Sequence, residues 1–347
     1  GTVRVSGVVA VTVIYAPEPE DTVKKLSLNI PFTCNFTSRG ITAESALCVS
    51  CAPTLVEARA LNPRKVLCRV NVVCSGTAYA PAEMSYMTGV EENSQTAELK
   101  ADEKRAYLCM DVNERTFSLI DELEMQSGRP MIGEILKNRI RLEIDDVKPV
   151  GNKVIFKGAA MLTVMYIAAD NGEACSADFE LPFSQIVELN RSLDEPECEI
   201  SVMLTGAEIT VGEEKRSIGV ALYMVAQGTA YKEMEIAPVT DIYSVTNELE
   251  PQWGSMTLNS LSDKCTRREI VEIDETVRNI CDSGALVGDV SVKHSGDTAE
   301  FSVEVYTTIC YINSDGCMRS VNKTITASVE TQCPDSATPS ATAAIAG

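Results

Sequence analysis

One stretch of sequence recurs along the chain, and this repetition constrains the fold more than any other feature. A set of landmarks in fixed order, Val147, Lys148, Gly151, Phe156 and Tyr166, recurs at an offset of 145 as Val292, Lys293, Gly296, Phe301 and Tyr311. A second set, Gly158, Tyr166, Pro182 and Phe183, matches Gly7, Tyr15, Pro31 and Phe32 at an offset of 151. A period of this length is typical of tandem domains and excludes a solenoid of short units.

Two further matches complete the repeat and indicate one insertion. The four residues 76–79 (GTAY) recur as 228–231 at an offset of 152. The pattern Phe117-Ser118 with Glu122-Leu123-Glu124 and Gln126 recurs as Tyr243-Ser244 with Glu248-Leu249-Glu250 and Gln252, at an offset of only 126. The difference of 26 between the two offsets predicts an insertion between Tyr79 and Phe117.

The apolar residues of the chain favour strands. Apolar content is 45% and aromatic content only 5%, so Val, Ile, Thr and Ala fill the apolar positions. Within residues 65–80 the side chains of Val66, Cys68, Val70 and Val72 fall on one face, which is the alternation of a sheet with one face on a core. We therefore predict an all-β chain of tandem β-sandwich-like modules, mostly antiparallel, with short helical or irregular connectors.

Strands are predicted where the alternation holds, over residues 2–16, 22–36, 46–60, 65–80, 139–147, 153–168, 177–189, 199–211, 216–231, 285–293, 298–311 and 318–330. Acidic and proline residues predict a turn at Pro17–Asp21. Propensity predicts a helix at Ala97–Tyr107 and a short helix at Met131–Asn138. Glu114–Gln126 and its copy Thr240–Gln252 are interpreted as short, turn-rich connectors and not as core strands.

The repeats predict six segments: a first repeat at 1–82, an insertion and connector at 83–134, a second repeat at 135–235, a connector at 236–276, a partial third repeat at 277–332 and a low-complexity tail at 333–347. The strand Arg139–Lys148, which leads the second repeat, has no copy in the first repeat. The third repeat has this leading strand but stops before a copy of Arg216–Tyr231. Either the chain is a piece of a longer one, or neighbouring molecules complete the terminal sheets, because an unpaired edge invites strand addition.

The charge and the apolar pattern argue against several classes of partner. A net charge of −20 disfavours nucleic acid and anionic membrane surfaces, where basic residues supply most of the affinity. No run approaches the ~20 apolar residues of a membrane helix, so membrane insertion is not expected. Most of the 13 Cys lie among β-branched neighbours, which favours small buried hydrophobes and assembly in a reducing compartment. Later oxidation of these thiols stays open.

The sequence contains no catalytic or metal-binding signature. His294 is the only His, lies in a turn and has no His at the matching place of the second repeat, so we expect no catalytic role for it. Cys48 and Cys51 form a CxxC motif that could join Cys68 and Cys74 in a four-thiolate zinc site. Their strand-like setting instead favours strand cysteines, because a redox CxxC usually opens a helix.

The remaining candidates also favour structural roles. Asp145-Asp146 and Glu213-Glu214 lie in or beside expected turns without the spacing of a Ca²⁺ loop. The single Trp, Trp253, is expected to be partly buried between domains rather than to anchor a partner. We therefore expect no enzyme, and we name no catalytic, cofactor-binding or metal-binding residue, no cofactor and no small-molecule substrate.

Four stretches together resemble a known family. They are KVIFKGAAMLTVMYIA with its closing Tyr166, Leu181-Pro182-Phe183, GEEKRSIGVALYMVAQGTAY, and DIYSVTNELE. They resemble the SPOCS domain of spore coat assembly proteins of clostridia and their relatives, which often occurs in tandem and often with a C-terminal lysin-motif domain. The resemblance covers the second repeat and parts of the other two. It implies a role in sporulation, with recruitment of the ATPase of the coat's basement layer as the family's known role. No lysin-motif domain is seen, so peptidoglycan binding is not implied.

Three functional hypotheses follow. The first is a non-enzymatic scaffold or adaptor of the spore coat or envelope, assembled from the mother-cell cytoplasm, which contacts a spore coat morphogenetic ATPase or other copies of itself through sheet edges. The second is a self-assembling subunit of an extracellular or spore-surface filament, joined head to tail by strand complementation. The third, a thiol or metal-binding protein, rests on the cysteine content alone.

Overall fold

The fold consists of β-strands, as the sequence predicts. The computed structural model describes residues 1–17, 23–90, 97–246, 248–258, 265–341, 343 and 345, without the side chain of Thr54. Most of the expected turn at Pro17–Asp21 therefore lies outside the described residues. The strands are β1 (Thr2–Tyr15), β2 (Lys24–Thr37), β3 (Ala46–Asn62), β4 (Lys65–Tyr79), β5 (Ala97–Ala101), β6 (Lys104–Glu124), β7 (Ile132–Val150), β8 (Lys153–Ala168), β9 (Ala174–Glu188), β10 (Glu197–Val211), β11 (Ser217–Ile236), β12 (Val239–Ser244), β13 (Val277–Ser295), β14 (Thr298–Asn313) and β15 (Met318–Gln332).

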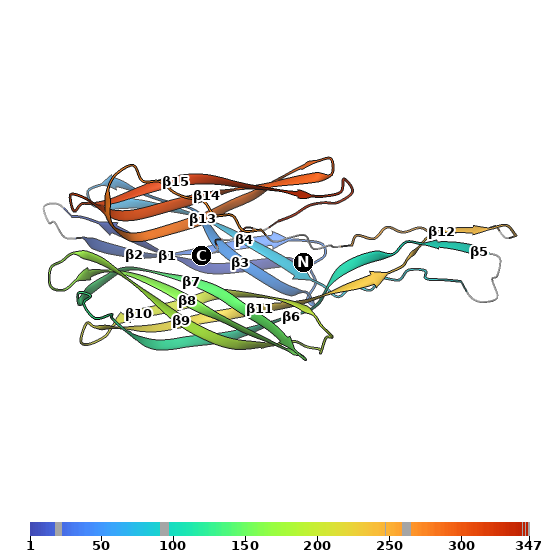
Figure 1. The fold of residues 1–347 in the computed structure, drawn as a ribbon, viewed down its shortest axis with the longest axis horizontal. Coiled ribbons are helices and arrows are strands. Elements are labelled where there is room, and N and C mark those ends of the chain that lie inside the picture. Colours follow the sequence, from blue (N-terminus) through green and yellow to red (C-terminus); the bar gives the residue numbers. More distant parts are fainter. Residues whose placement is uncertain are drawn as a thin grey trace.

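These strands form antiparallel sheets that follow the repeats. The second module consists of the sheets β7-β8-β9 and β10-β11-β6, which pack face to face. The first module consists of the two-stranded sheets β1-β2 and β3-β4, and the third module is the sheet β13-β14-β15. A narrow ribbon of β5 and β12, here called the arm, projects from one end of the body (Figure 1). The described part of the chain contains no helix that is long and apolar enough to span a membrane.

The core of the protein lies in the second module. Phe156, Leu162, Tyr166 and Leu222 are at most 1% exposed there. Of the described residues outside 106–236, the only buried hydrophobic ones are Val3, Cys281, Ala299, Tyr311 and Cys333. The whole chain exposes 23240 Å², whereas a compact monomer of its size exposes about 14,000 Å². The excess indicates that the other sheets leave much of their surface uncovered.

The long strand β6 corrects two of the sequence-based predictions. Glu114–Gln126 was predicted as a connector, but β6 pairs with β11 along its whole length and closes the sandwich. The side chains of Asn113 and Arg115 donate hydrogen bonds to the carbonyls of Glu188 (2.6 Å) and Ile186 (3.0 Å). The prediction was wrong because the acidic residues of this stretch are exposed, while Phe117, Leu119 and Leu123 pack against the core.

Both predicted helices are also wrong. Ala97–Tyr107 is divided between β5 and β6, because pairing with β12 and β11 overrides helix propensity. Met131–Asn138 is the start of β7, where Ile132, Ile135 and Leu136 are buried. Register shifts follow Ile132 and Ile135, so these bulges produce the spacing of a helix face inside a strand. Thr240–Gln252, predicted as a connector, begins inside β12 and continues without regular structure from residue 248.

Equivalent strands can be assigned by the sequence offsets. β1, β8 and β14 correspond, as do β2, β9 and β15, while β3 and β4 correspond to β10 and β11, and β13 corresponds to β7. Among the described strands, the first module has no counterpart of β6 or β7. The third module has no counterpart of β10 or β11 there.

The modules meet through equivalent residues. The ion pair Lys137–Asp282 joins β7 to β13 across the offset of 145, and Arg139 adds a contact to Asp282 at 3.3 Å. The hydroxyls of Tyr79 and Tyr231, related by the offset of 152, are 2.7 Å apart. Beside the first of these contacts, one apolar cluster gathers residues of all three modules, namely Leu136, Met165 and Cys281 with Ile14, Val23, Ile167, Ala174, Ile312 and Met318. The ion pair and the tyrosine pair therefore each join equivalent positions of two repeats.

Candidate interaction surface

The inward face of β4 is the first candidate feature. The equivalent face of β11 is buried in the core of the second module, whereas that of β4 is only partly buried. On β11 the inward residues Val220, Leu222, Met224 and Ala226 are at most 2% exposed. Their equivalents on β4, at the offset of 152, are Cys68, Val70, Val72 and Cys74, and each is only partly buried. The apolar pattern of the two strands is the same, but the layers that cover it differ.

The free edge of β4 explains part of this difference. β11 lies between β10 and β6, whereas β4 pairs with β3 alone among the described strands. In the same way β8 lies between β7 and β9, whereas β1 pairs only with β2. An unpaired edge presents a row of backbone donors and acceptors that can accept another strand. Compared with β8 and β11, the strands β1 and β4 thus each have one side without a partner among the described strands.

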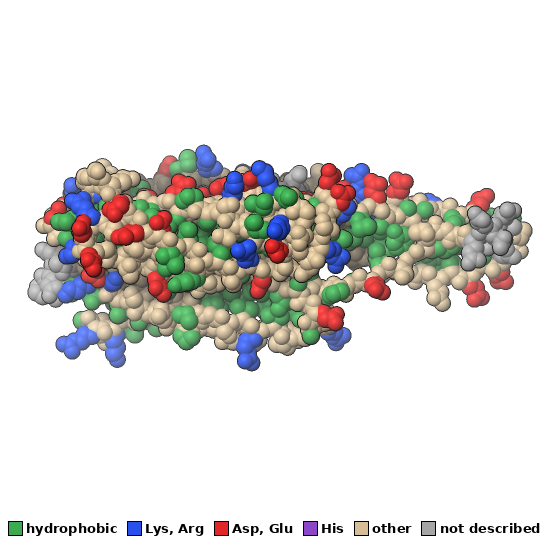
Figure 2. Space-filling view, turned by 90° about the horizontal axis from the view of Figure 1, so that it is seen from below, with side chains coloured by type: hydrophobic (Ala, Val, Ile, Leu, Met, Phe, Trp, Pro, Cys, Tyr) green, Lys and Arg blue, Asp and Glu red, His purple; other side chains and the backbone are tan. Residues whose placement is uncertain are grey.

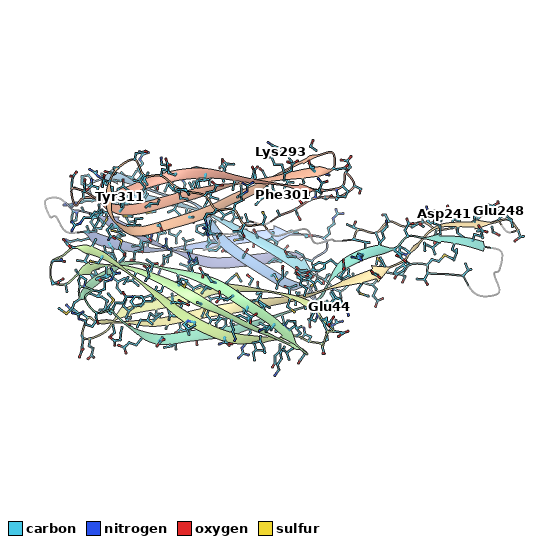
Figure 3. The ribbon with its side chains drawn as sticks, in the orientation of Figure 1. Glu44, Asp241, Glu248, Lys293, Phe301 and Tyr311 are labelled. Atoms are coloured by element: carbon cyan, nitrogen blue, oxygen red, sulfur yellow. The ribbon has the colours of Figure 1, made fainter. Side chains whose placement is uncertain are left out.

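The arm is the second candidate feature. Tyr243 of β12 is 61% exposed, and Val245, which directly follows β12, is 77% exposed. Figure 2 shows hydrophobic side chains gathered along this projection with acidic groups beside them. Figure 3 marks Asp241 and Glu248 on the arm, well away from the body of the molecule. Isolated exposed hydrophobics are ordinary, but a run of them on a projecting strand indicates a contact site.

The arm carries a copy of β6. Phe117, Leu119 and Leu123 of β6 pack against the second module's core. At the offset of 126 their equivalents are Tyr243, Val245 and Leu249, and all three are exposed. Residues 240–246 therefore have the sequence of a core strand and the exposure of a surface strand. The offset of 126 in the sequence showed this duplication. The same stretch was nevertheless predicted to be a connector, because it is rich in acidic residues.

The cysteines of the CxxC motif do not gather at one site. Cys51 and Cys74 face each other across β3 and β4, with their Sγ atoms 3.2 Å apart. Burial raises the pKa of Cys74, and contact with Cys51 raises it further. Cys48 instead lies 3.8 Å from the hydroxyl of Thr229, and burial raises the pKa of Cys48. Within the described residues, no group of three or more His, Cys, Asp or Glu is arranged to hold a metal ion.

The other sequence candidates are separate from one another. The Nε2 atom of His294 lies 3.1 Å from the carbonyl of Cys333 at the end of the third module. Asp145-Asp146 lies at a bulge within β7, and Glu213-Glu214 in the exposed turn before β11. Trp253 is 59% exposed, so the prediction of a partly buried packing residue was wrong. It lies on the irregular stretch after the arm, where the described residues form no sheet to cover it.

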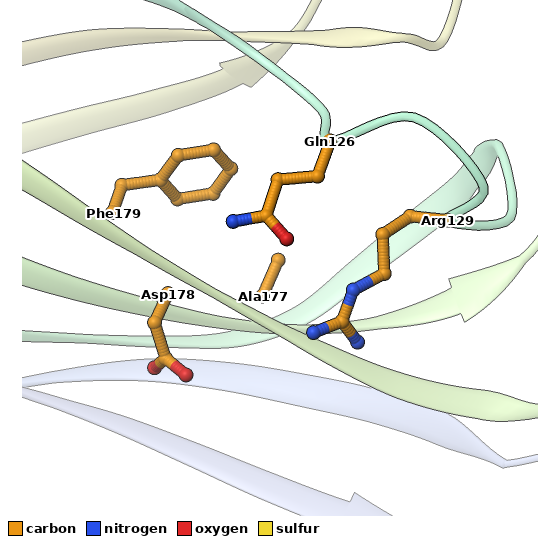
Figure 4. A pocket seen from close by; sticks show the side chains of 5 residues that line it. All are labelled: Gln126, Arg129, Ala177, Asp178 and Phe179. Atoms are coloured by element: carbon orange, nitrogen blue, oxygen red, sulfur yellow. The ribbon is translucent and has the colours of Figure 1, made fainter.

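Two hollows on the surface of the described residues were considered as ligand sites. One of about 90 Å³ is lined by Gln126, Arg129, Ala177, Asp178 and Phe179 (Figure 4). It is below the range of about 300–1,000 Å³ that is usual for small-molecule sites. A second, of about 470 Å³, is lined by Pro149, Gly151 and residues 193–196. These hollows do not bring the sequence candidates together, which directs attention to the sheet edges.

One comparison with known proteins finds a family within the second repeat. Residues 131–211 match the family model described as SipL, SPOCS domain. The second repeat carries a SPOCS domain. The match runs from the start of β7 to the end of β10 and confirms the resemblance seen in the sequence. The SPOCS domain indicates a sporulation-related protein. No curated protein and no solved structure matches the chain.

Proposed function

We propose that the protein is a non-enzymatic scaffold or adaptor of spore coat or envelope assembly, acting through protein contacts at its open sheet edges. The observation that carries this proposal is the SPOCS domain at residues 131–211, beside which β1 and β4 each pair with one strand only among the described strands. Main-chain hydrogen bonds at such an edge supply affinity, and pockets for alternate side chains supply specificity. A morphogenetic ATPase of the spore coat is the proposed partner, and the coat or envelope is the proposed location.

The test uses a spore-forming bacterium that encodes the protein. A tagged chain is expected to accumulate around the developing spore and to co-purify with coat proteins from sporulating cells. The matched variant carries Val72→Asp on the inward face of β4, and its retained fold is checked by the protection of β11 amides. Loss of the partners in this variant is expected, whereas a diffuse chain with no coat partners would contradict the proposal.

A self-assembling filament subunit is the second candidate. The specific observation in its favour is the exposure of Tyr243 and Val245, together with strand edges that have no partner among the described strands. A head-to-tail contact that does not close on itself produces a filament. Electron microscopy of the purified chain is expected to show fibres, and its hydrodynamic mass is expected to rise with concentration.

A further inference from the structure

Three cysteine side chains of the first module meet where its two sheets face each other. Cys51 and Cys74 lie directly opposite each other on β3 and β4, with their Sγ atoms 3.2 Å apart. A hydrogen bond joins the thiol of Cys74 to that of Cys34, which belongs to β2 in the other sheet. Cys74 therefore has one thiol partner in its own sheet and one in the opposite sheet.

The packing of β2 on β4 places Cys34 beside Cys74 on separate grounds. A Cβ atom at Gly76 would lie 2.9 Å from the Cζ atom of Phe36, so the two strands are in close contact there. Cys34 precedes Phe36 by two positions, and Cys74 precedes Gly76 by two. Residues two apart in a strand share a face, so the contact continues along both strands to the two thiols.

The second module has the same packing without thiols. Phe36 and Gly76 correspond to Val187 and Gly228, and a Cβ atom at Gly228 would lie 3.1 Å from the side chain of Val187. At the places of the three cysteines the second module carries Gln185, Val202 and Ala226. The repeat therefore does not need sulfur at these places, which leaves the chemistry of the three thiols to be explained.

We propose that Cys34, Cys51 and Cys74 form a thiol–disulfide exchange site, here called the thiol triad, whose oxidant is a disulfide of low molecular weight. Cys74 is the shared sulfur of the triad. It bonds to Cys51 within one sheet, or to Cys34 across the two sheets. The second bond ties the sheets β1-β2 and β3-β4 together covalently.

The external disulfide balances the oxidation. One thiolate of the facing pair Cys51 and Cys74 attacks a sulfur of the reagent, forms a mixed disulfide and expels a thiolate. The other thiolate of the pair then attacks the mixed disulfide and expels the second half of the reagent. Two electrons and two protons thus pass from the pair to the reagent, which leaves as two thiols.

The exchange within the triad needs no further oxidant. The thiolate of Cys34 attacks the sulfur of Cys74, the bond between Cys74 and Cys51 breaks, and the proton lost by Cys34 ends on Cys51. Burial raises the pKa of Cys34 and of Cys74, so more alkaline solution is expected to speed the attack by forming more thiolate.

The experiment treats the full chain with oxidised glutathione at mildly alkaline pH. Free thiols are then blocked by alkylation, and peptide mapping without reduction identifies the bonds. Cys51→Ser is expected to give the bond between Cys34 and Cys74, and Cys34→Ser the bond between Cys51 and Cys74. Cys74→Ser removes the shared sulfur, so the yield of disulfide between Cys34 and Cys51 is expected to be at least about tenfold lower.

The matched control is Cys68→Ser. Cys68 lies on the same face of β4 as Cys74 but opposite Ala58, so its replacement is expected to leave the bonds of the triad unchanged. The hydrogen exchange of the β4 amides checks that each variant keeps the fold.

The unaltered chain tests the exchange itself. After a short oxidation the glutathione is removed, and the bond between Cys51 and Cys74 is expected to convert in part to the bond between Cys34 and Cys74, until their ratio is constant. A free Cys34 in oxidised Cys51→Ser, no conversion after removal of the reagent, or an undiminished bond between Cys34 and Cys51 in Cys74→Ser would overturn the proposal.

Discussion

Leu222 on β11 and Val70 on β4 occupy the same place in their repeats, yet only Leu222 lies in a dry core. The second module surrounds β11 with β10 and β6 and covers it with β7-β8-β9. The first module keeps the strands and their apolar alternation but has no counterpart of β6 or β7 among the described strands. The comparison teaches that alternation decides which face of a strand turns inward, whereas the number of neighbouring strands decides whether that face is buried.

The largest expected difference between the modules is the effect of truncating these two side chains. Leu222→Ala removes atoms from a close-packed core and is expected to destabilise the second module by about 3 to 4 kcal/mol. Val70→Ala is expected to cost less than about 1 kcal/mol, because water already reaches that site. Urea unfolding, followed by the hydrogen exchange of each strand, measures both effects. Equal losses would contradict the difference in burial.

Oxidation of Cys51 and Cys74 to a disulfide is expected to stabilise the first module by about as much as Leu222→Ala destabilises the second. Cys51 and Cys74 face each other across β3 and β4, so a disulfide oxidant such as diamide should take up their two protons and two electrons and join them. Closing this loop is expected to be worth about 3 kcal/mol for the β3-β4 pair. Peptide mapping identifies the bond, and Cys68, which lies opposite Ala58, is the control that should stay reduced. A disulfide at Cys68 in place of Cys74 would contradict this register.

Gly158 and its equivalent Gly7 are expected to differ in the stability that is lost when each is replaced by alanine. A Cβ atom at Gly158 would overlap the carbonyl oxygen of Glu143 on β7, so Gly158→Ala is expected to cost about 2 to 3 kcal/mol. The equivalent Gly7 has no such neighbouring strand, and its Cβ would meet the ring of Phe32 at 2.8 Å. That ring can turn aside, so Gly7→Ala is expected to cost less than about 1 kcal/mol. Thermal unfolding of the two variants provides the comparison, and a larger loss for Gly7→Ala would refute it.

The smallest expected effect is a pH dependence of stability that arises from Cys281, which lies where the three modules meet. Burial, followed by the nearby Cys310, raises the pKa of Cys281 from 9.0 to about 11. The folded state therefore holds this proton more tightly than the unfolded state. Its contribution, about 2 kcal/mol, is complete below pH 9 and is lost as the pH rises from 9 towards 11.

The measurement is the slope of stability against pH over that interval. Cys281→Ala is expected to flatten the slope, and Cys265→Ala, at an exposed cysteine, is expected to leave it unchanged. The same slope in all three chains would mean that Cys281 does not titrate differently in the folded state.

The sequence alone predicted the strands of the repeats well and their neighbours poorly. β8 was predicted residue for residue, because its alternation is long and its flanking turns contain Gly151 and Gly172, both with positive φ. β6 was missed because its pairing with β11 is set by contacts about a hundred residues apart, which local pattern does not report. The start of β7 was predicted as a helix because its bulges space the buried residues as on a helix face, and local pattern does not report bulges.

The candidate surface could be predicted only in part. The duplicated pattern at Tyr243 and Leu249 was visible in the sequence, but its exposure on a projecting ribbon was not. Whether an apolar residue is covered depends on the whole arrangement of sheets, as the exposed Trp253 shows. The facing thiols of Cys51 and Cys74 likewise depend on the register of β3 and β4 and not on the CxxC spacing.

Native-state hydrogen exchange of β4 and β11 tests the central claim most directly. The claim is that β11 lies in a closed sandwich, while the same apolar face of β4 is only partly covered by the described strands. The measurement is made on dilute protein, so that association does not cover β4. The amides of β11 are expected to exchange only when the whole module unfolds, and those of β4 through local opening at least a hundredfold faster, which corresponds to about 3 kcal/mol. Equal protection of the two strands would contradict the account.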